Sequence, residues 1–176
     1  MLLLLALPMH SGTAKHSQEL APPPETVEQK LQQMGVTLYD LPAPTGNFVR
    51  AVRSGNLIFL AGHGPRKPDG SNVVGKLGQE LTVEEGQTAA RYAAITLLSA
   101  LKDEIGDLDK VQRIVKVHGM VNSTAEFTDQ PQVMNVFSDF MVEVFGESGK
   151  HARAAVGMAS LPGNIAVEVE MIVEVE

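Results

Sequence analysis

The sequence predicts one α+β domain of the split β-α-β kind, with two helices on one face of a mixed or antiparallel sheet. Three observations support this prediction. Two segments with helical spacing begin after capping residues, near positions 82 and 130. Residues 165–176 alternate almost strictly between apolar and polar side chains, as a half-buried strand does. A continuous apolar run over residues 57–61 indicates a further strand.

The composition limits the possible functions. The chain has 176 residues, of which 44% are hydrophobic, so it can form one domain with a substantial core. Its net charge of −7 argues against a nucleic-acid partner, which would require a basic surface. It has no cysteine, which excludes disulfides, thiolate metal sites and cysteine nucleophiles. No two of its five histidines stand at metal-ligand spacing, so we expect no metal site.

Residues 1–35 are expected to be a tail and linker, followed by the domain proper at residues 36–176. Residues 2–7 are apolar and similar to a secretory leader, but no basic residue precedes them and the run is too short to span a bilayer. We therefore expect a cytoplasmic protein without a membrane span, with export through a weak N-terminal leader as the alternative. A short helix is predicted by the spacing of Val27, Leu31 and Met34.

The first part of the domain is predicted to form strands. Residues 36–41 predict a short strand, and residues 47–53 alternate, with Phe48 and Arg50 on one side. The apolar run at residues 57–61 predicts a strand that is buried on both faces. The segment Gly62-His63-Gly64-Pro65 ends this strand.

Two helices follow, separated by a strand. The first is predicted to begin at a capping box formed by Thr82 and Glu85. Its apolar stripe consists of Ala90, Ala94, Leu97, Leu98, Leu101 and Ile105. Residues 111–121 predict the intervening strand. The second helix is predicted to be capped at Asp129 and to end at Gly146, with an apolar face of Val133, Val136, Phe137, Phe140, Met141 and Val144.

The C-terminal residues predict two paired strands joined by a turn at residues 161–164, where a Pro-Gly pair supplies turn geometry. The predicted register puts Ala155 opposite Glu168, with Arg153 diagonal to Glu168. Arg153 and Glu168 would then share a strip otherwise lined by Ala and Gly, with room for a small anion. An inter-strand ion pair without further role is the alternative.

The face of the sheet that the helices do not cover is expected to be partly apolar. The run at residues 57–61 supplies its apolar side chains, and one chain has no third layer to place over them. We therefore expect other copies of the chain to cover this face.

Three segments together resemble the reactive intermediate deaminases (the Rid or enamine/imine deaminase family, formerly "endoribonuclease L-PSP"). Residues 56–65 are similar to the family's strand followed by Ser-Gly-Gln-x-Pro, residues 133–140 to its second helix, and residues 152–162 with 167–170 to its C-terminal signature. Extra residues at 126–131 indicate a divergent subgroup. The resemblance implies a chorismate-mutase-like fold and a homotrimer whose sheets form a central barrel, with sites in the clefts between subunits.

The resemblance also implies an activity, the cofactor-independent hydrolysis of reactive 2-enamine or 2-imino acids to 2-keto acids and ammonia. Such hydrolysis would serve metabolite damage control. Arg153 matches the family's ligand for the substrate carboxylate, and Glu168 matches its water-positioning acid. Asn135 matches a site residue on the second helix, and Gly62 and Ala155 match positions whose backbone lines the pocket.

The residue types suit this chemistry. A guanidinium binds a carboxylate through two parallel hydrogen bonds that a lysine cannot reproduce. A protonated imine carbon is already electrophilic, so water needs only a positioned acceptor, and a partly desolvated carboxylate can serve as one.

Two positions depart from the family pattern. Phe48 stands where members often have Tyr, and Ala61 stands where they often have Ser, so two hydroxyls are missing. Phe48 could still form a wall of the pocket, and His63, in place of the usual Gln, could offer a new donor or acceptor. His118 and His151 are expected to be ordinary interface or surface residues.

The departures keep a second hypothesis open, a non-catalytic trimeric binder of small carboxylate metabolites that uses the same Arg153. A ribonuclease is a third hypothesis, but the acidic composition and the lack of a histidine pair weigh against it. A chorismate mutase would need several clustered arginines for its dianionic substrate, and only Arg153 is clearly placed.

Overall fold

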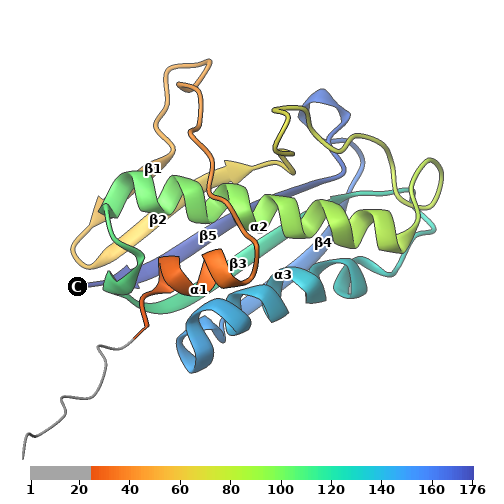
Figure 1. Cartoon of the computed structure of the whole chain (residues 1–176). Coiled ribbons are helices and arrows are strands. Elements are labelled where there is room, and N and C mark those ends of the chain that lie inside the picture. The colour runs from red at the N-terminus through yellow and green to blue at the C-terminus, as the bar shows by residue number, and fades with distance from the viewer. Residues whose placement is uncertain (1–24) are drawn as a thin grey trace, which may run out of the picture.

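The computed structural model describes residues 25–176 and arranges them in two layers, a sheet and the helices on one of its faces (Figure 1). The α-helices and strands in chain order are α1 (Val27–Gln33), β1 (Ala51–Ser54), β2 (Leu57–His63), α2 (Val83–Ile105), β3 (Val111–Asn122), α3 (Gln130–Phe145), β4 (Ala152–Met158) and β5 (Val167–Val175). Short 3₁₀ turns lie at η1 (Leu108–Lys110), η2 (Gly146–Gly149) and η3 (Pro162–Asn164). The predicted α+β class and the order of its elements are confirmed.

The two long helices form where their local signals predict them. The Thr82 hydroxyl accepts a hydrogen bond from the Glu85 backbone N–H, and the Glu85 carboxylate accepts one from the Thr82 N–H, so the capping box of α2 is present. Gly106 ends α2 with a φ of 78°, a left-handed conformation that favours glycine. Asp129 precedes α3, but its side chain makes no capping hydrogen bond, so that detail of the prediction is wrong.

The core lies between the helices and the sheet. Every residue of the predicted α2 stripe is buried, and α3 buries its predicted face except Val136, with Met134 buried in addition. From the sheet, β5 contributes its alternate residues, which are at most 2% exposed: Val167, Val169, Met171, Val173 and Val175. The alternation read from the sequence therefore places the inner face of β5 correctly.

The predicted pairing of the two last strands is wrong. The sheet order is β1-β2-β5-β3-β4, so β3 lies between β4 and β5. Strand β4 pairs parallel with β3, and β5 pairs antiparallel with both β2 and β3. In this central position β5 forms hydrogen bonds on both sides, which an edge hairpin with β4 would not give it.

The link between β4 and β5 crosses the end of β3. The backbone N–H of Asn122, the last residue of β3, donates to Ala166 O, and its side-chain amide donates to Asn164 Oδ1 at 2.9 Å. The Ser123 N–H donates to Met158 O on the other side. Residues 161–164, predicted to be a hairpin turn, therefore belong to a connection that passes the end of β3 to join β4 and β5.

Three further expectations about strands are corrected. Residues 36–41 form no strand; this connection crosses α2 (Figure 1), and the Tyr39 N–H donates to Ser99 Oγ at 2.9 Å. The run at residues 57–61 is not buried on both faces of the chain, because Phe59 remains 42% exposed. Register shifts in β3 place both Ile114 and Val117 on the buried face, although a regular strand would put them on opposite sides.

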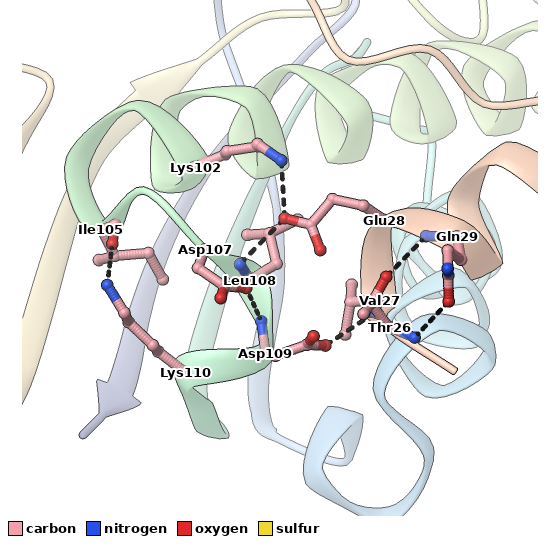
Figure 2. Close-up of polar contacts among 10 residues, drawn as sticks. All are labelled: Thr26, Val27, Glu28, Gln29, Lys102, Ile105, Asp107, Leu108, Asp109 and Lys110. Atoms are coloured by element: carbon pink, nitrogen blue, oxygen red, sulfur yellow. Dashed lines mark hydrogen bonds and ion pairs between the residues drawn. The ribbon is translucent and has the colours of Figure 1, made fainter. Parts of the chain in front are cut away.

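The short helix α1 is present and is tied to the connection between α2 and β3 (Figure 2). The Glu28 carboxylate accepts from Lys102 Nζ at 2.7 Å and from the Leu108 N–H at 3.2 Å, and Asp109 Oδ1 accepts from the Val27 N–H at 2.7 Å. Leu31 of α1 is 2% exposed and belongs to the common hydrophobic core.

Between residues 25 and 176, no helix combines the length and the apolar character needed to cross a bilayer. The leader predicted at residues 2–7 lies outside the described residues.

Candidate active site

The residues predicted for the site fall on opposite faces of the sheet. Arg153 pairs with Val117, and Val117 pairs with Met171; these two neighbours are buried beneath the helices. Glu168 pairs with Met120, three residues further along β3, and therefore faces the other side. The predicted strip shared by Arg153 and Glu168 does not exist within one chain, because β4 pairs with β3 and this pairing sets its faces.

On the helix side, Arg153 is held by α3. Its Nη1 donates to Ser138 Oγ at 2.9 Å, and its Nη2 donates to Asn135 Oδ1 at 3.0 Å. Asn135 and Ser138 are three residues apart, so they share one face of the helix. The guanidinium has further N–H groups beyond these two, and none of them donates to another of residues 25–176, which leaves them to bind a ligand. Ala155, the next residue of β4 on this face, is partly buried against the core.

His151 is linked to Arg153 through Ser138, whose hydroxyl contacts both side chains. Its Nδ1 lies 2.7 Å from Gly149 O, and a carbonyl can only accept, so Nδ1 carries the proton. Its Nε2 lies 3.1 Å from Ser138 Oγ and accepts from that hydroxyl. Burial, together with the charge of Arg153, holds the pKa of His151 below its usual value, although the bond to Gly149 opposes this. We call Asn135, Ser138, His151 and Arg153 the Arg153 cluster.

On the open face, Glu168 borders a hollow of about 500 Å³. The segment 41–45 forms part of its wall, and Figure 1 shows the connection between α1 and β1 projecting beyond the sheet before it returns. The residues that line the hollow include four from the predicted site and two arginines: Phe48, Gly62, His63, Glu168, Arg50 and Arg66. We call this region the Glu168 hollow.

The Glu168 carboxylate has no polar partner among the described residues. No hydrogen bond or ion pair from residues 25–176 reaches it, and burial, followed by the negative charge of Glu170, raises its pKa. It lies against Gly62 so closely that a Cβ at that position would overlap the carboxylate. Gly62 is therefore needed for space, and the carboxylate above it is a free acceptor.

His63 is the buried polar residue of this hollow, with 8% of its surface exposed. Its Nδ1 lies 2.7 Å from Ala61 O and so carries the proton. Burial lowers the pKa of His63, and the charge of Arg50 acts in the same direction. Its Nε2 is then an unprotonated acceptor. Phe48, by contrast, is 58% exposed, as expected for a wall of an open hollow.

Arg50 also lines the Glu168 hollow. Its Nη2 is enclosed by protein and has no hydrogen-bond partner among the described residues. The alternation of residues 47–53 predicts Arg50 on the same side as Phe48 but indicates no role for it.

Ser138 and His151 were likewise missed as members of a site. The helical spacing of Ser138 from Asn135 was the available signal, since residues three apart meet the same neighbour. No comparable signal existed for Arg50, because the enclosure of its guanidinium depends on residues distant in the sequence.

One acidic group could attract a metal ion. Oxygens of Glu28, Asp107 and Asp109 lie within 4.8 Å of one another. All three carboxylates already accept hydrogen bonds from the chain, however, and two of them hold α1 in place. These contacts account for the cluster structurally (Figure 2).

The fold defines a small α+β protein of the split β-α-β class, and comparison with known proteins places it in a family. The family profile described as "YjgF/chorismate mutase-like, putative endoribonuclease" matches residues 28–175. The chain therefore belongs to the YjgF/chorismate mutase-like family. The resemblance identified from the sequence and the fold it implied are confirmed.

The names of individual relatives differ in whether they state an activity. The chain is 45% identical over 149 residues to Protein TCP17 of Trypanosoma cruzi, covering 84% of this chain and 93% of that protein. It is 30% identical over 136 residues to a 2-iminobutanoate/2-iminopropanoate deaminase of Dermatophagoides farinae, covering 77% and 91%. The crystal structure of Atu1372 from Agrobacterium tumefaciens, a protein of unknown function, matches with a TM-score of 0.79 at 40% identity, covering 86% of this chain and 94% of that one.

Proposed function

We propose that this protein hydrolyses reactive 2-enamine or 2-imino acids to 2-keto acids and ammonia without a cofactor. The observation that carries the proposal is the Glu168 carboxylate, which is half-buried, has a raised pKa and is free to accept a proton from water. A relative at 30% identity is named as a deaminase of such imines, which supports the same chemistry for this chain.

In this mechanism Arg153 binds the substrate carboxylate through its free N–H groups, while Asn135 and Ser138 hold the guanidinium in place. Glu168 accepts a hydrogen bond from a water molecule and takes its proton as the oxygen attacks the protonated imine carbon. The resulting tetrahedral carbon carries OH and NH₂ groups. Glu168 passes the proton to the nitrogen and the C–N bond breaks, so that ammonia leaves. The hydroxyl oxygen forms the C=O bond of the keto acid and gives its proton back to the Glu168 carboxylate.

Such a site requires more than one chain, because Arg153 and Glu168 occupy opposite faces of the sheet. We propose a homotrimer in which the Arg153 cluster of one subunit closes over the Glu168 hollow of the next. The open face supports association, since it leaves large apolar side chains exposed: Val49, Val52, Phe59 and Val156.

The second candidate is a trimeric binder of small carboxylates that does not turn them over. Phe48 and Ala61 favour it, since neither supplies a hydroxyl to the hollow. The binder predicts stabilisation by a keto acid in a thermal melt without any release of keto acid from an imine.

The test is the hydrolysis of 2-iminobutanoate generated in the assay by an amino-acid oxidase, followed as 2-oxobutanoate formation above the buffer rate. We expect acceleration by the wild type and a loss of about 100-fold or more in Arg153→Ala, since a charged ligand to the substrate is removed. Arg113→Ala, at an exposed position on β3, is the matched control and should retain activity. A wild-type rate equal to the buffer rate would refute the deaminase and leave the binder.

A further inference from the structure

Arg50 is the charged group of the Glu168 hollow that the proposed mechanism does not use. Its Nη2 is enclosed, and nothing in residues 25–176 accepts from it. Leaving a buried cationic donor without a partner is costly, and native proteins rarely do so without a ligand, water or ion at the position.

Two other arginines of the chain have partners within the protein for their guanidinium groups. Arg53 donates to Gly55 O and to Glu176 O, at 3.0 and 2.7 Å. Arg91 lies over the ring of Phe140, with its guanidinium carbon 4.5 Å from the centroid. Among the described residues Arg50 has neither kind of contact, although it directly precedes β1, the strand that carries Arg53.

Glu168 does not neutralise Arg50. No ion pair within 4.0 Å joins them among the described residues, and the groups that set the pKa of Glu168 are its burial and Glu170, both of which raise it. The charge of Arg50 instead contributes to the lowered pKa of His63, and both residues line the same hollow. The inner part of the hollow thus holds an uncompensated positive charge and a neutral histidine.

We propose that the Glu168 hollow receives dicarboxylic 2-imino acids and that Arg50 binds their second, side-chain carboxylate. This inference rests on the proposed function, in which Arg153 of a neighbouring subunit binds the first carboxylate. A guanidinium matches a carboxylate in shape and charge, and a hollow of about 500 Å³ has room for the longer substrate. Arg66 lines the same hollow and adds to its positive charge.

The experiment compares two imines on three proteins. Oxidases acting on glutamate and on 2-aminobutanoate supply 2-iminoglutarate and 2-iminobutanoate, and the ratio of their kcat/KM values is measured for wild type, Arg50→Gln and Arg113→Gln. We expect the wild type to favour 2-iminoglutarate and Arg50→Gln to lower the ratio by about 10- to 100-fold, the usual value of a charge-assisted hydrogen bond. Arg113→Gln should leave the ratio unchanged.

A binding measurement separates this inference from the deaminase proposal. In thermal melts, 2-oxoglutarate should raise the Tm of the wild type more than 2-oxobutanoate does, and Arg50→Gln should abolish the difference. If no imine is hydrolysed but this difference is found, the proposed function fails and the second acid-binding position stands. If imines are hydrolysed with a ratio that does not depend on Arg50, the second position is refuted and the deaminase stands.

Two further results would overturn the inference. One is equal stabilisation by the two keto acids in wild type and Arg50→Gln, whatever the activity. The other is dissociation of the oligomer by Arg50→Gln in size-exclusion chromatography, because Arg50 would then have its partner on another subunit.

Discussion

The Arg153 cluster and the Glu168 hollow both contain charged and polar side chains, but they differ in whether those side chains have hydrogen-bond partners within the described chain. In the cluster, the chain itself supplies partners: Arg153 binds Asn135 and Ser138, and Ser138 binds His151. In the hollow, the Glu168 carboxylate and the Arg50 Nη2 have no partner within the described chain. The fold of one chain therefore fixes the position of the Arg153 guanidinium, whereas Glu168 and Arg50 in the hollow are left to bind groups from outside the described chain.

The largest effect should come from removing the free acceptor of the hollow. Glu168→Gln keeps the shape but cannot take a proton, so we expect kcat for imine hydrolysis to fall by about 100- to 10,000-fold, the usual range for a general base. The measurement is keto-acid formation under saturating substrate. Glu104→Gln, an exposed position on α2, is the control and should behave as wild type. Full activity of Glu168→Gln would mean that the hollow does not perform the chemistry.

The next effect tests whether the position of the Glu168 carboxylate depends on the absence of a side chain at Gly62. Gly62→Ala places a methyl group where the Glu168 carboxylate lies, so the carboxylate must move. We expect a loss of about 1–3 kcal/mol in the free energy of unfolding, typical of overpacking, together with a clear fall in kcat. Gly55→Ala, away from the hollow, is the contrast: nothing lies near its Cβ, but its φ of 63° imposes backbone strain, so stability should fall without loss of kcat. Equal kcat for wild type and Gly62→Ala would contradict the assigned position of Glu168.

A smaller effect is expected from loosening the Arg153 cluster. Ser138→Ala removes one of the two anchors of Arg153 and leaves His151 Nε2 without its donor. Because Asn135 still holds the guanidinium, we expect KM to rise about three- to tenfold with little change in kcat, and stability to fall by about 1–2 kcal/mol.

Ser54→Ala, at an exposed position on β1, provides the control for the loss of a serine hydroxyl. A change in kcat of Ser138→Ala with no change in KM would contradict the assignment of Ser138 as a residue that positions the carboxylate ligand.

The smallest effect is a shift in the pH profile. The Glu168 carboxylate must be ionised to accept a proton, so activity should fall as pH decreases through its raised pKa. Glu170 contributes to that raised pKa through its negative charge, and Glu170→Gln should therefore move the acidic limb of kcat/KM to lower pH. Rates must be corrected for hydrolysis in buffer at each pH. A limb that stays in place or moves to higher pH would mean that Glu168 does not control it.

Local signals predicted much of the fold. The capping box at Thr82 and the helical spacing of α2 and α3 depend on residues within a few positions of one another, and the structure contains both helices. The alternation in β5 also correctly identified its buried side. These predictions are confirmed because each feature is determined by backbone geometry and by the burial of one face of a helix or strand.

The predicted site was affected by a single non-local error. Pairing β4 with β5 placed Arg153 beside Glu168, whereas the pairing of both β4 and β5 with β3 puts them on opposite faces. Hydrophobic alternation cannot distinguish these arrangements, because it reports which side of a strand is apolar and does not report its neighbour. The family resemblance does not depend on this pairing, because it rests on sequence segments, and its assignment of both residues to a site stays a prediction.

The sequence by itself therefore determined the family, the class of fold, the extent of α2 and α3 and the inner face of β5, all of which follow from short-range patterns. Only the tertiary structure decided the strand order, the separation of Arg153 from Glu168, and the enclosure of an Arg50 nitrogen without a partner. The physical reason is that strand pairing and side-chain burial arise from contacts between residues far apart in the chain, and their competition is settled only when the whole domain packs.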